Sequence, residues 1–188
     1  APIINNILEK KIINKIVNPT LLALKKKRNA YTGFLYVGLM IKNNEPYLIE
    51  YNVRMGDPEC QVIIPRLKTD LVKIINAAVE NKLNKIKIKW KKEKCISIVL
   101  CSKGYPNQYT TNKLINLDRI KLTKKSFIFH AGTKLKNNML FSNGGRVLNI
   151  VVLGNTFFKI RNQAIKIIKK INWRYGFFRK DIGWRVIK

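Results

Sequence analysis

The stretch of sequence that decides the fold is LIEYNVR, residues 48–54. Side chains of a β-strand alternate between its two faces, so Glu50, Asn52 and Arg54 share one face and the apolar residues between them share the other. We therefore expect a strand with one polar face and one face that enters a core.

The polar face carries the candidate chemistry. Glu50 and Asn52 offer a carboxylate and an amide oxygen two residues apart, and Mg²⁺ accepts such oxygens while sharing its remaining positions with substrate phosphates. Arg54 lies one step further along and has the forked donors that neutralise phosphate charge. A solvated outer face of an edge hairpin is the alternative interpretation of the same three residues.

The segments around this strand indicate a hairpin flanked by helices. Residues 31–42 are apolar on both faces, which predicts a strand covered on both sides, and 43–46 (NNEP) predicts the turn that pairs it with a strand over 47–53. A helix is expected over 1–18, broken at Asn18-Pro19, with Thr20 capping a short second helix. Residues 54–59 are expected to form a loop, 69–82 a helix capped by Thr69, and 86–90 a short strand.

The pattern changes near residue 90. Strands are predicted over 95–101, 126–131 and 146–153, followed by a helix over 157–171. We expect an α+β fold in two parts, 1–90 and 91–188, in which an antiparallel sheet with helices precedes a small β-rich domain with one packed helix.

Composition allows a globular protein with an extreme charge. Lys and Arg number 38 against 10 acidic residues, a net charge of +28. The basic residues are mostly scattered lysines, so we favour a solvated lysine surface over a nucleic-acid-binding site, which typically combines clustered arginine with stacking aromatics. Three cysteines without a C-x-x-C pair argue against zinc and for a reducing compartment. No apolar run approaches membrane-spanning length, so we expect a soluble, cytoplasmic protein.

A family resemblance then emerges from ordered blocks of sequence. The octapeptide RMGDPECQ, residues 54–61, resembles the R-x-G-D-P-E-x-Q signature of phosphoribosylamine–glycine ligases, which are ATP-grasp enzymes of purine biosynthesis. YTGFLYVGLM at 31–40 and PRLKTDL at 65–71 resemble further blocks of that family. Blocks typical of its carboxy-terminal domain follow in order at 104–106, 129–133, 143–148 and 179–184.

The resemblance implies the carboxy-terminal half of an ATP-grasp domain followed by the carboxy-terminal domain of such a ligase. The implied reaction joins glycine to 5-phosphoribosylamine with ATP, giving glycinamide ribonucleotide, ADP and phosphate through an acyl phosphate of glycine. It implies that Glu50 and Asn52 bind Mg²⁺ or Mn²⁺. We assign Arg54 to phosphate neutralisation as the catalytic residue, and we expect Asn52 and Arg54 to contact the nucleotide.

The roles of other residues stay open at this stage. Gly56, Asp57 and Glu59 are candidate substrate-binding residues, and the two carboxylates are equally compatible with an ion-pair network that holds the loop. For His130 we favour a packed or hydrogen-bonded role over that of a general base. For 143–146 (NGGR) we favour a tight turn over a phosphate-binding loop.

Members of that family are more than twice as long as this chain, so we expect activity to need an amino-terminal part, joined to it or supplied as a separate chain. The expected ligands are ATP, glycine and phosphoribosylamine, with no specific nucleic acid and no membrane. The alternatives are a degenerate, non-catalytic remnant and, less favoured, a basic nucleic-acid-binding protein.

Overall fold

The protein was analysed as a computed structural model that describes residues 3–187. The chain forms two compact units: Ala1–Gly56 with Thr69–Lys89, called here the first unit, and Asp57–Lys68 with Trp90–Lys188, the second unit. The second unit thus takes in a segment that the sequence placed in the first part. The domain boundary at residue 90 stays a prediction.

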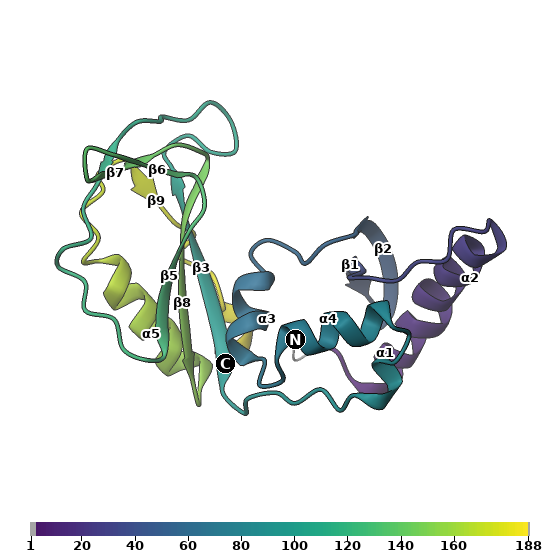
Figure 1. The fold of residues 1–188 in the computed structure, drawn as a ribbon. Coiled ribbons are helices and arrows are strands. Elements are labelled where there is room, and N and C mark those ends of the chain that lie inside the picture. The colour runs from purple at the N-terminus through teal and green to yellow at the C-terminus, as the bar shows by residue number, and fades with distance from the viewer. Residues whose placement is uncertain (1–2, 188) are drawn as a thin grey trace. The chain divides into compact units, whose positions relative to one another are not determined.

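The first unit begins with a helix that runs past Pro19 (Figure 1). It consists of α1 (Asn6–Ile12), a π-helical turn η1 (Ile13–Val17) and α2 (Asn18–Lys26). The predicted break at Asn18-Pro19 is therefore wrong. Proline has no backbone N–H to donate within a helix. In the wide turn before it, Asn18 N–H donates to Ile13 O. Pro19 therefore lies in the first turn of α2, where a backbone N–H is not needed. Ala1 and Pro2 lie outside the described residues.

The long helix is attached to the hairpin by polar contacts. Thr20 does not cap a helix as predicted: its hydroxyl donates to Ile16 O at 2.8 Å and lies 2.5 Å from the Tyr51 hydroxyl. A helix that continues through Thr20 leaves no free N–H groups there to cap. Lys11 and Lys15 both bond to the Glu45 carboxylate, which lowers the pKa of Glu45.

The predicted hairpin is present, with β1 (Tyr36–Lys42) antiparallel to β2 (Glu45–Asn52). Asn43 and Asn44 form its two-residue turn, both with the positive φ that such turns require. The sequence predicted that the first strand is covered on both sides and that one face of the second enters a core. Neither strand is buried in this way, because the sheet has only these two strands. Met40 on β1 is 58% exposed, while Ile49 on β2 and Val53 just beyond it are 64% and 72% exposed.

Two further predictions about the first unit need correction. The helix α4 spans Leu71–Val79, and its cap is Asp70, whose carboxylate accepts from Lys73 N, whereas Thr69 instead accepts a hydrogen bond from Lys89 N. The expected strand at 86–90 does not form. A short 3₁₀ turn η2 (Leu83–Lys85) precedes it, and only an isolated bridge between Trp90 and Leu67, within the second unit, is made.

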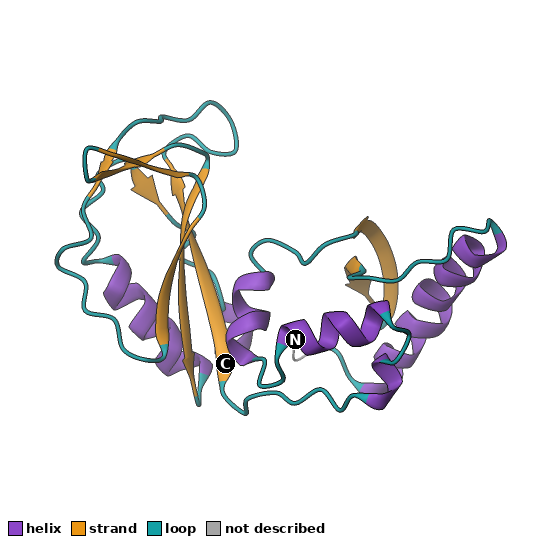
Figure 2. Ribbon diagram, in the orientation of Figure 1, coloured by secondary structure: helices purple, strands orange, loops and turns teal. Residues whose placement is uncertain are grey.

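The second unit is built around a four-stranded antiparallel sheet in the order β5-β8-β3-β9 (Figure 2). The predicted strands correspond to β3 (Lys94–Ser102), β5 (Ser126–His130) and β8 (Arg146–Gly154). The two-residue β9 (Gly176–Phe177) completes the sheet. The helix α5 (Phe157–Ile168) is capped by Thr156 and packs on β8 and β3.

This sheet and α5 enclose the hydrophobic core. The central strand β8 has β5 and β3 on either side, and seven of its nine residues are buried. Ile98 and Leu100 of β3 pack with Leu148 and Ile150 of β8 against Ala164 and its neighbours on α5. The helix predicted over 157–171 is confirmed as far as Ile168, and the α+β fold class is confirmed with it.

The sequence did not predict the remaining elements of this unit. They are α3 (Cys60–Arg66), η3 (Trp184–Val186) and a three-stranded sheet in the order β4-β7-β6, formed by Leu114–Ile115, Met139–Ser142 and Thr133–Lys136. The helix α3 contacts β3 and β8. None of the three cysteines forms a disulfide, and burial raises the pKa of Cys95 to about 11, so that thiol stays protonated at neutral pH.

Candidate functional site

Glu50 and Asn52 lie side by side at the end of β2. The Asn52 side-chain nitrogen donates to Glu50 Oε1 at 3.0 Å, so the two side chains project from the same face as the alternation predicted. Ile49 is an extra residue in the strand, because Gly38 pairs with Glu50 while Leu39 pairs with Leu48. This irregularity lies before Glu50, and it leaves the spacing of Glu50 and Asn52 intact.

Gly38 lets the Glu50 side chain lie close over the partner strand. A Cβ added at Gly38 would come within 2.9 Å of Glu50 Cγ. The sequence YVGLM therefore provides space for the carboxylate at this point of the hairpin. Arg54 follows the strand, is exposed, and donates to the carbonyl of Met55 at 2.9 Å.

The two units divide the octapeptide between them. Arg54, Met55 and the buried Gly56 belong to the first unit, and Asp57 begins the segment that belongs to the second. Within the first unit, the structure thus brings Glu50 and Asn52 together. Asp57 and Glu59 have their surroundings in the second unit.

Asp57 is held by a residue that sequence analysis did not assign to it. Its carboxylate lies 3.0 Å from Arg146 Nη2, and Arg146 Nη1 also donates to the Asp57 carbonyl at 3.1 Å. Gln61 Nε2 donates to Asp57 Oδ1 at 2.9 Å. Arg146 opens β8, 89 residues away, and only its place in the block 143–148 gave a signal in the sequence.

Glu59 stands at the start of α3. Its carbonyl accepts from the backbone N–H groups of Val62 and Ile63, and it is partly buried. The signature octapeptide therefore has two local functions in this fold: it ends the polar strand, and its acidic part leads into a helix that packs on the second unit's sheet.

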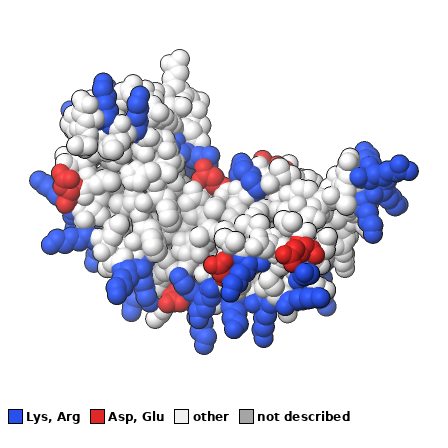
Figure 3. Space-filling model, viewed as in Figure 1, with Lys and Arg blue, Asp and Glu red and all other residues white. Residues whose placement is uncertain are grey.

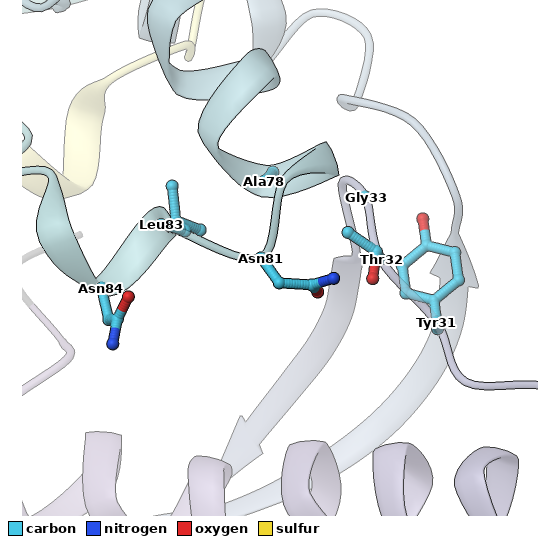
Figure 4. Close-up of a pocket in the computed structure, with 7 residues that line it drawn as sticks. All are labelled: Tyr31, Thr32, Gly33, Ala78, Asn81, Leu83 and Asn84. Atoms are coloured by element: carbon cyan, nitrogen blue, oxygen red, sulfur yellow. The ribbon is translucent and has the colours of Figure 1, made fainter.

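A pocket of about 350 Å³ opens in the first unit beside the start of the YTGF segment (Figure 4). Tyr31, Thr32 and Gly33 line it from one side, and residues that follow α4, including Asn81 and Leu83, line it from the other. Figure 4 shows the Asn81 amide extending toward Thr32. None of the candidate site residues lines this pocket.

The other candidates in the second unit have structural surroundings. His130 is exposed, and its Nδ1 lies 3.2 Å from the Thr133 hydroxyl, in line with the hydrogen-bonded role that the sequence favoured. The turn at 143–145 is closely packed. A Cβ on Gly132 would lie 2.7 Å from Gly144 Cα, and one on Gly145 would lie 2.3 Å from the Tyr105 ring.

On the face that Figure 3 shows, basic side chains lie in several separate groups. One continuous run, Lys25, Lys26, Lys27 and Arg28, is exposed at the end of α2. Over residues 3–187, no group of three His, Cys, Asp or Glu residues is arranged to hold a metal. In the same range, no helix is long and apolar enough to cross a membrane.

Comparison with known proteins identifies the family. The family model described as "Phosphoribosylglycinamide synthetase, ATP-grasp (A) domain" matches residues 1–60, and "Phosphoribosylglycinamide synthetase, C domain" matches residues 95–185. The chain belongs to the phosphoribosylamine–glycine ligase family. The resemblance inferred from the sequence blocks is thereby confirmed.

Individual members of the ligase family support the same conclusion. The chain is 39% identical to the phosphoribosylamine–glycine ligase of Agrobacterium fabrum over 187 residues and 40% identical to that of Caldanaerobacter subterraneus over 180. These matches cover 100% and 94% of this chain but 44% and 43% of the relatives. The solved ligase of Thermotoga maritima matches 96% of this chain and 44% of its own, with a TM-score of 0.76 and 32% identity.

The residues present fit a metal site that is completed by a ligand. The Asn52 amide nitrogen is used in the bond to Glu50, which leaves its oxygen for a cation, and the carboxylate supplies the negative charge. Mg²⁺ is commonly held by one or two carboxylates together with substrate phosphates and water, so two protein oxygens are compatible with it.

Proposed function

We propose that this chain supplies part of the ATP site of a phosphoribosylamine–glycine ligase and acts together with the part of such a ligase that it does not span. The reaction is the ATP-dependent joining of glycine to 5-phosphoribosylamine, which yields glycinamide ribonucleotide, ADP and phosphate. The observation that carries this proposal is the adjacent pair of Glu50 and Asn52, in a segment that matches the ATP-grasp family model.

Glu50 and Asn52 are proposed to hold Mg²⁺ or Mn²⁺ through the carboxylate and the amide oxygen. The metal ion would supply positive charge to the phosphate oxygens of ATP. Asn52 and Arg54 are proposed to contact the nucleotide, and the Arg54 guanidinium neutralises phosphate charge as the catalytic residue. The exposure of Arg54 supports this role, because a phosphate can reach it.

The chemistry requires two transfers. A glycine carboxylate oxygen attacks the γ-phosphorus and ADP leaves, after which the amine of phosphoribosylamine attacks the acyl carbon and phosphate leaves. Catalysis of both steps consists chiefly of positioning and charge neutralisation. Gly56, Asp57 and Glu59 are proposed to bind substrate. The Arg146 and Gln61 contacts to Asp57 favour a positioning role for Asp57.

The first test is metal binding by the chain itself. We expect Mn²⁺, followed by electron paramagnetic resonance, to bind more tightly with ATP present, and Glu50→Gln to weaken that binding at least tenfold because the carboxylate charge is lost. Glu80→Gln removes an exposed carboxylate elsewhere in the first unit and should leave binding unchanged. Equal binding by all three proteins contradicts the metal assignment.

The second test is turnover. Phosphate release from ATP with glycine and phosphoribosylamine is measured with this chain alone and with the remaining part of a family ligase added. Activity only in the mixture supports the proposal. Absence of both metal binding and turnover identifies a non-catalytic remnant.

The exposed basic run at the end of α2 motivates one control. Binding to a duplex DNA is measured at rising salt, because contacts with phosphates weaken steeply as salt increases. Binding that disappears by physiological salt indicates charge alone, whereas binding that persists favours the nucleic-acid alternative. The cytoplasmic location expected from the sequence stays a prediction.

A further inference from the structure

The first unit buries very little apolar surface. Among the described residues, Leu8 and Ala77 are the only buried hydrophobic residues of this unit. The hydrophobic core cluster of the protein lies entirely in the second unit. A unit of this size needs an apolar core to offset the conformational entropy of folding. The first unit therefore buries too little apolar surface within itself.

The helix α4 shows where the missing contact belongs. Its sequence, LVKIINAAV, has only Lys73 and Asn76 as polar residues, and both are exposed. One side carries the buried Ala77, while Val72, Ile75 and Val79, which share the other side at helical spacing, are 63%, 39% and 72% exposed. A surface helix normally covers its solvent-facing side with polar residues, whereas on α4 these three branched apolar side chains share that side with Lys73 and Asn76.

We propose that Val72, Ile75 and Val79, called here the α4 stripe, form a docking surface for the part of a ligase-family polypeptide that this chain does not span. The chain covers all of its own length but only 44% of the Agrobacterium fabrum relative, so more than half of such a ligase is available as the occupant. The identity of this partner rests on the proposed function. The surface itself rests on the exposure of the stripe and the absence of a core beneath it.

Three properties make the stripe a specific surface. It is continuous along one side of a regular, capped helix. Its side chains are branched and stiff, so they lose little rotamer freedom on contact. It is also separate in sequence from Glu50 and Asn52, so docking and metal binding can be changed independently.

The test titrates this chain with a recombinant polypeptide that comprises the unmatched part of the Agrobacterium fabrum ligase. Sedimentation velocity and calorimetry should show a 1:1 complex. We expect the double variant Val72→Gln with Val79→Gln to raise the Kd at least tenfold, because two apolar side chains no longer gain from burial. Phe158→Gln, which changes a 60% exposed apolar residue on α5 of the second unit, is the matched control and should leave the Kd unchanged.

Hydrogen exchange locates the contact without relying on the variants. Amides of 71–79 should exchange at least tenfold more slowly in the complex. No complex, a complex that leaves α4 unprotected, self-association of this chain through the stripe, or binding of the chain to lipid vesicles through the stripe would each overturn the proposal. A complex without turnover would contradict the proposed function and leave the docking surface standing.

Discussion

The two units of this protein are stabilised in different ways. The second unit encloses a continuous core between its four-stranded sheet and α5, in which Val147, Leu148 and Ile150 have no exposed surface. The first unit is a hairpin, a long helix and a short helix, in which polar contacts of Glu45 and Tyr51 join the long helix to the hairpin and no comparable core is enclosed by the described residues. Apolar content alone does not make a core, because the elements must also have enough neighbours to cover it.

The largest expected difference between the two units is in the effect of removing an apolar side chain. Ile150→Ala should lower its free energy of unfolding by about 3 kcal/mol, because Ile150 is fully buried and its removal leaves a cavity. Ile49→Ala in the first unit should change stability by less than about 0.5 kcal/mol, because Ile49 is 64% exposed. Urea denaturation followed by fluorescence measures both, and equal effects would refute the contrast.

A second prediction concerns the close backbone packing of the second unit. Gly132→Ala should cost about 2 kcal/mol, because its new Cβ would lie 2.7 Å from the Arg146 carbonyl oxygen and from Gly144 Cα, and backbone moves less readily than a side chain. Gly38→Ala in the first unit meets only the Glu50 side chain at this range and should cost less. Thermal unfolding of the two variants compares them, and a larger cost at Gly38 would contradict the prediction.

The ion pair of Asp57 and Arg146 should contribute less to the free energy of unfolding than the close packing at Gly132 does. Both side chains are more than a third exposed, at 35% and 42%, so solvent screening limits the loss in Arg146→Ala to below about 1 kcal/mol. The local effect is larger than the global one, because amides at 57–61 lose an anchor and should exchange faster. Arg146→Lys should restore part of that protection. Unchanged exchange in Arg146→Ala would show that Gln61 alone holds the loop.

The smallest effect is expected at Glu45 in the first unit. Its pKa is lowered by hydrogen bonds to Lys11 and Lys15, so the stability from this contact is present above the unfolded pKa and is lost as the pH falls through the lowered pKa of the folded state. Glu45→Gln should remove this dependence while leaving the second unit unchanged. Hydrogen exchange of α1 at pH 6 and pH 4 measures this pH dependence in the parent chain and in Glu45→Gln. Equal pH dependence in the two proteins would exclude the Glu45 contact as the cause.

Periodicity predicted the elements whose residues pack regularly. The strands at 95–101 and 146–153 and the helix at 157–171 were found because their apolar residues recur at the spacing of the structure they form. The segment 60–66 was missed because Pro65 argues against a helix, although α3 accommodates it in its last turn. The long helix was divided at Pro19 because local rules do not register a π-turn upstream.

The candidate site was predictable only in its local part. Glu50 and Asn52 lie two residues apart on one strand, so alternation alone places their side chains together. The pairing of Asp57 with Arg146 joins residues 89 positions apart, and no spacing rule connects them. The sequence blocks placed both residues in one family but gave no indication that they touch.

The wide turn at Ile13–Val17 has a consequence for protein engineering. It holds one more residue than a regular helical turn would, and the residues after it are rotated by about 100° relative to an uninterrupted α-helix. Deleting one residue there would return Pro19 to a position where its ring opposes a carbonyl, and it would carry Thr20 away from the Tyr51 hydroxyl. The extra residue therefore sets the angular position at which α2 meets the hairpin.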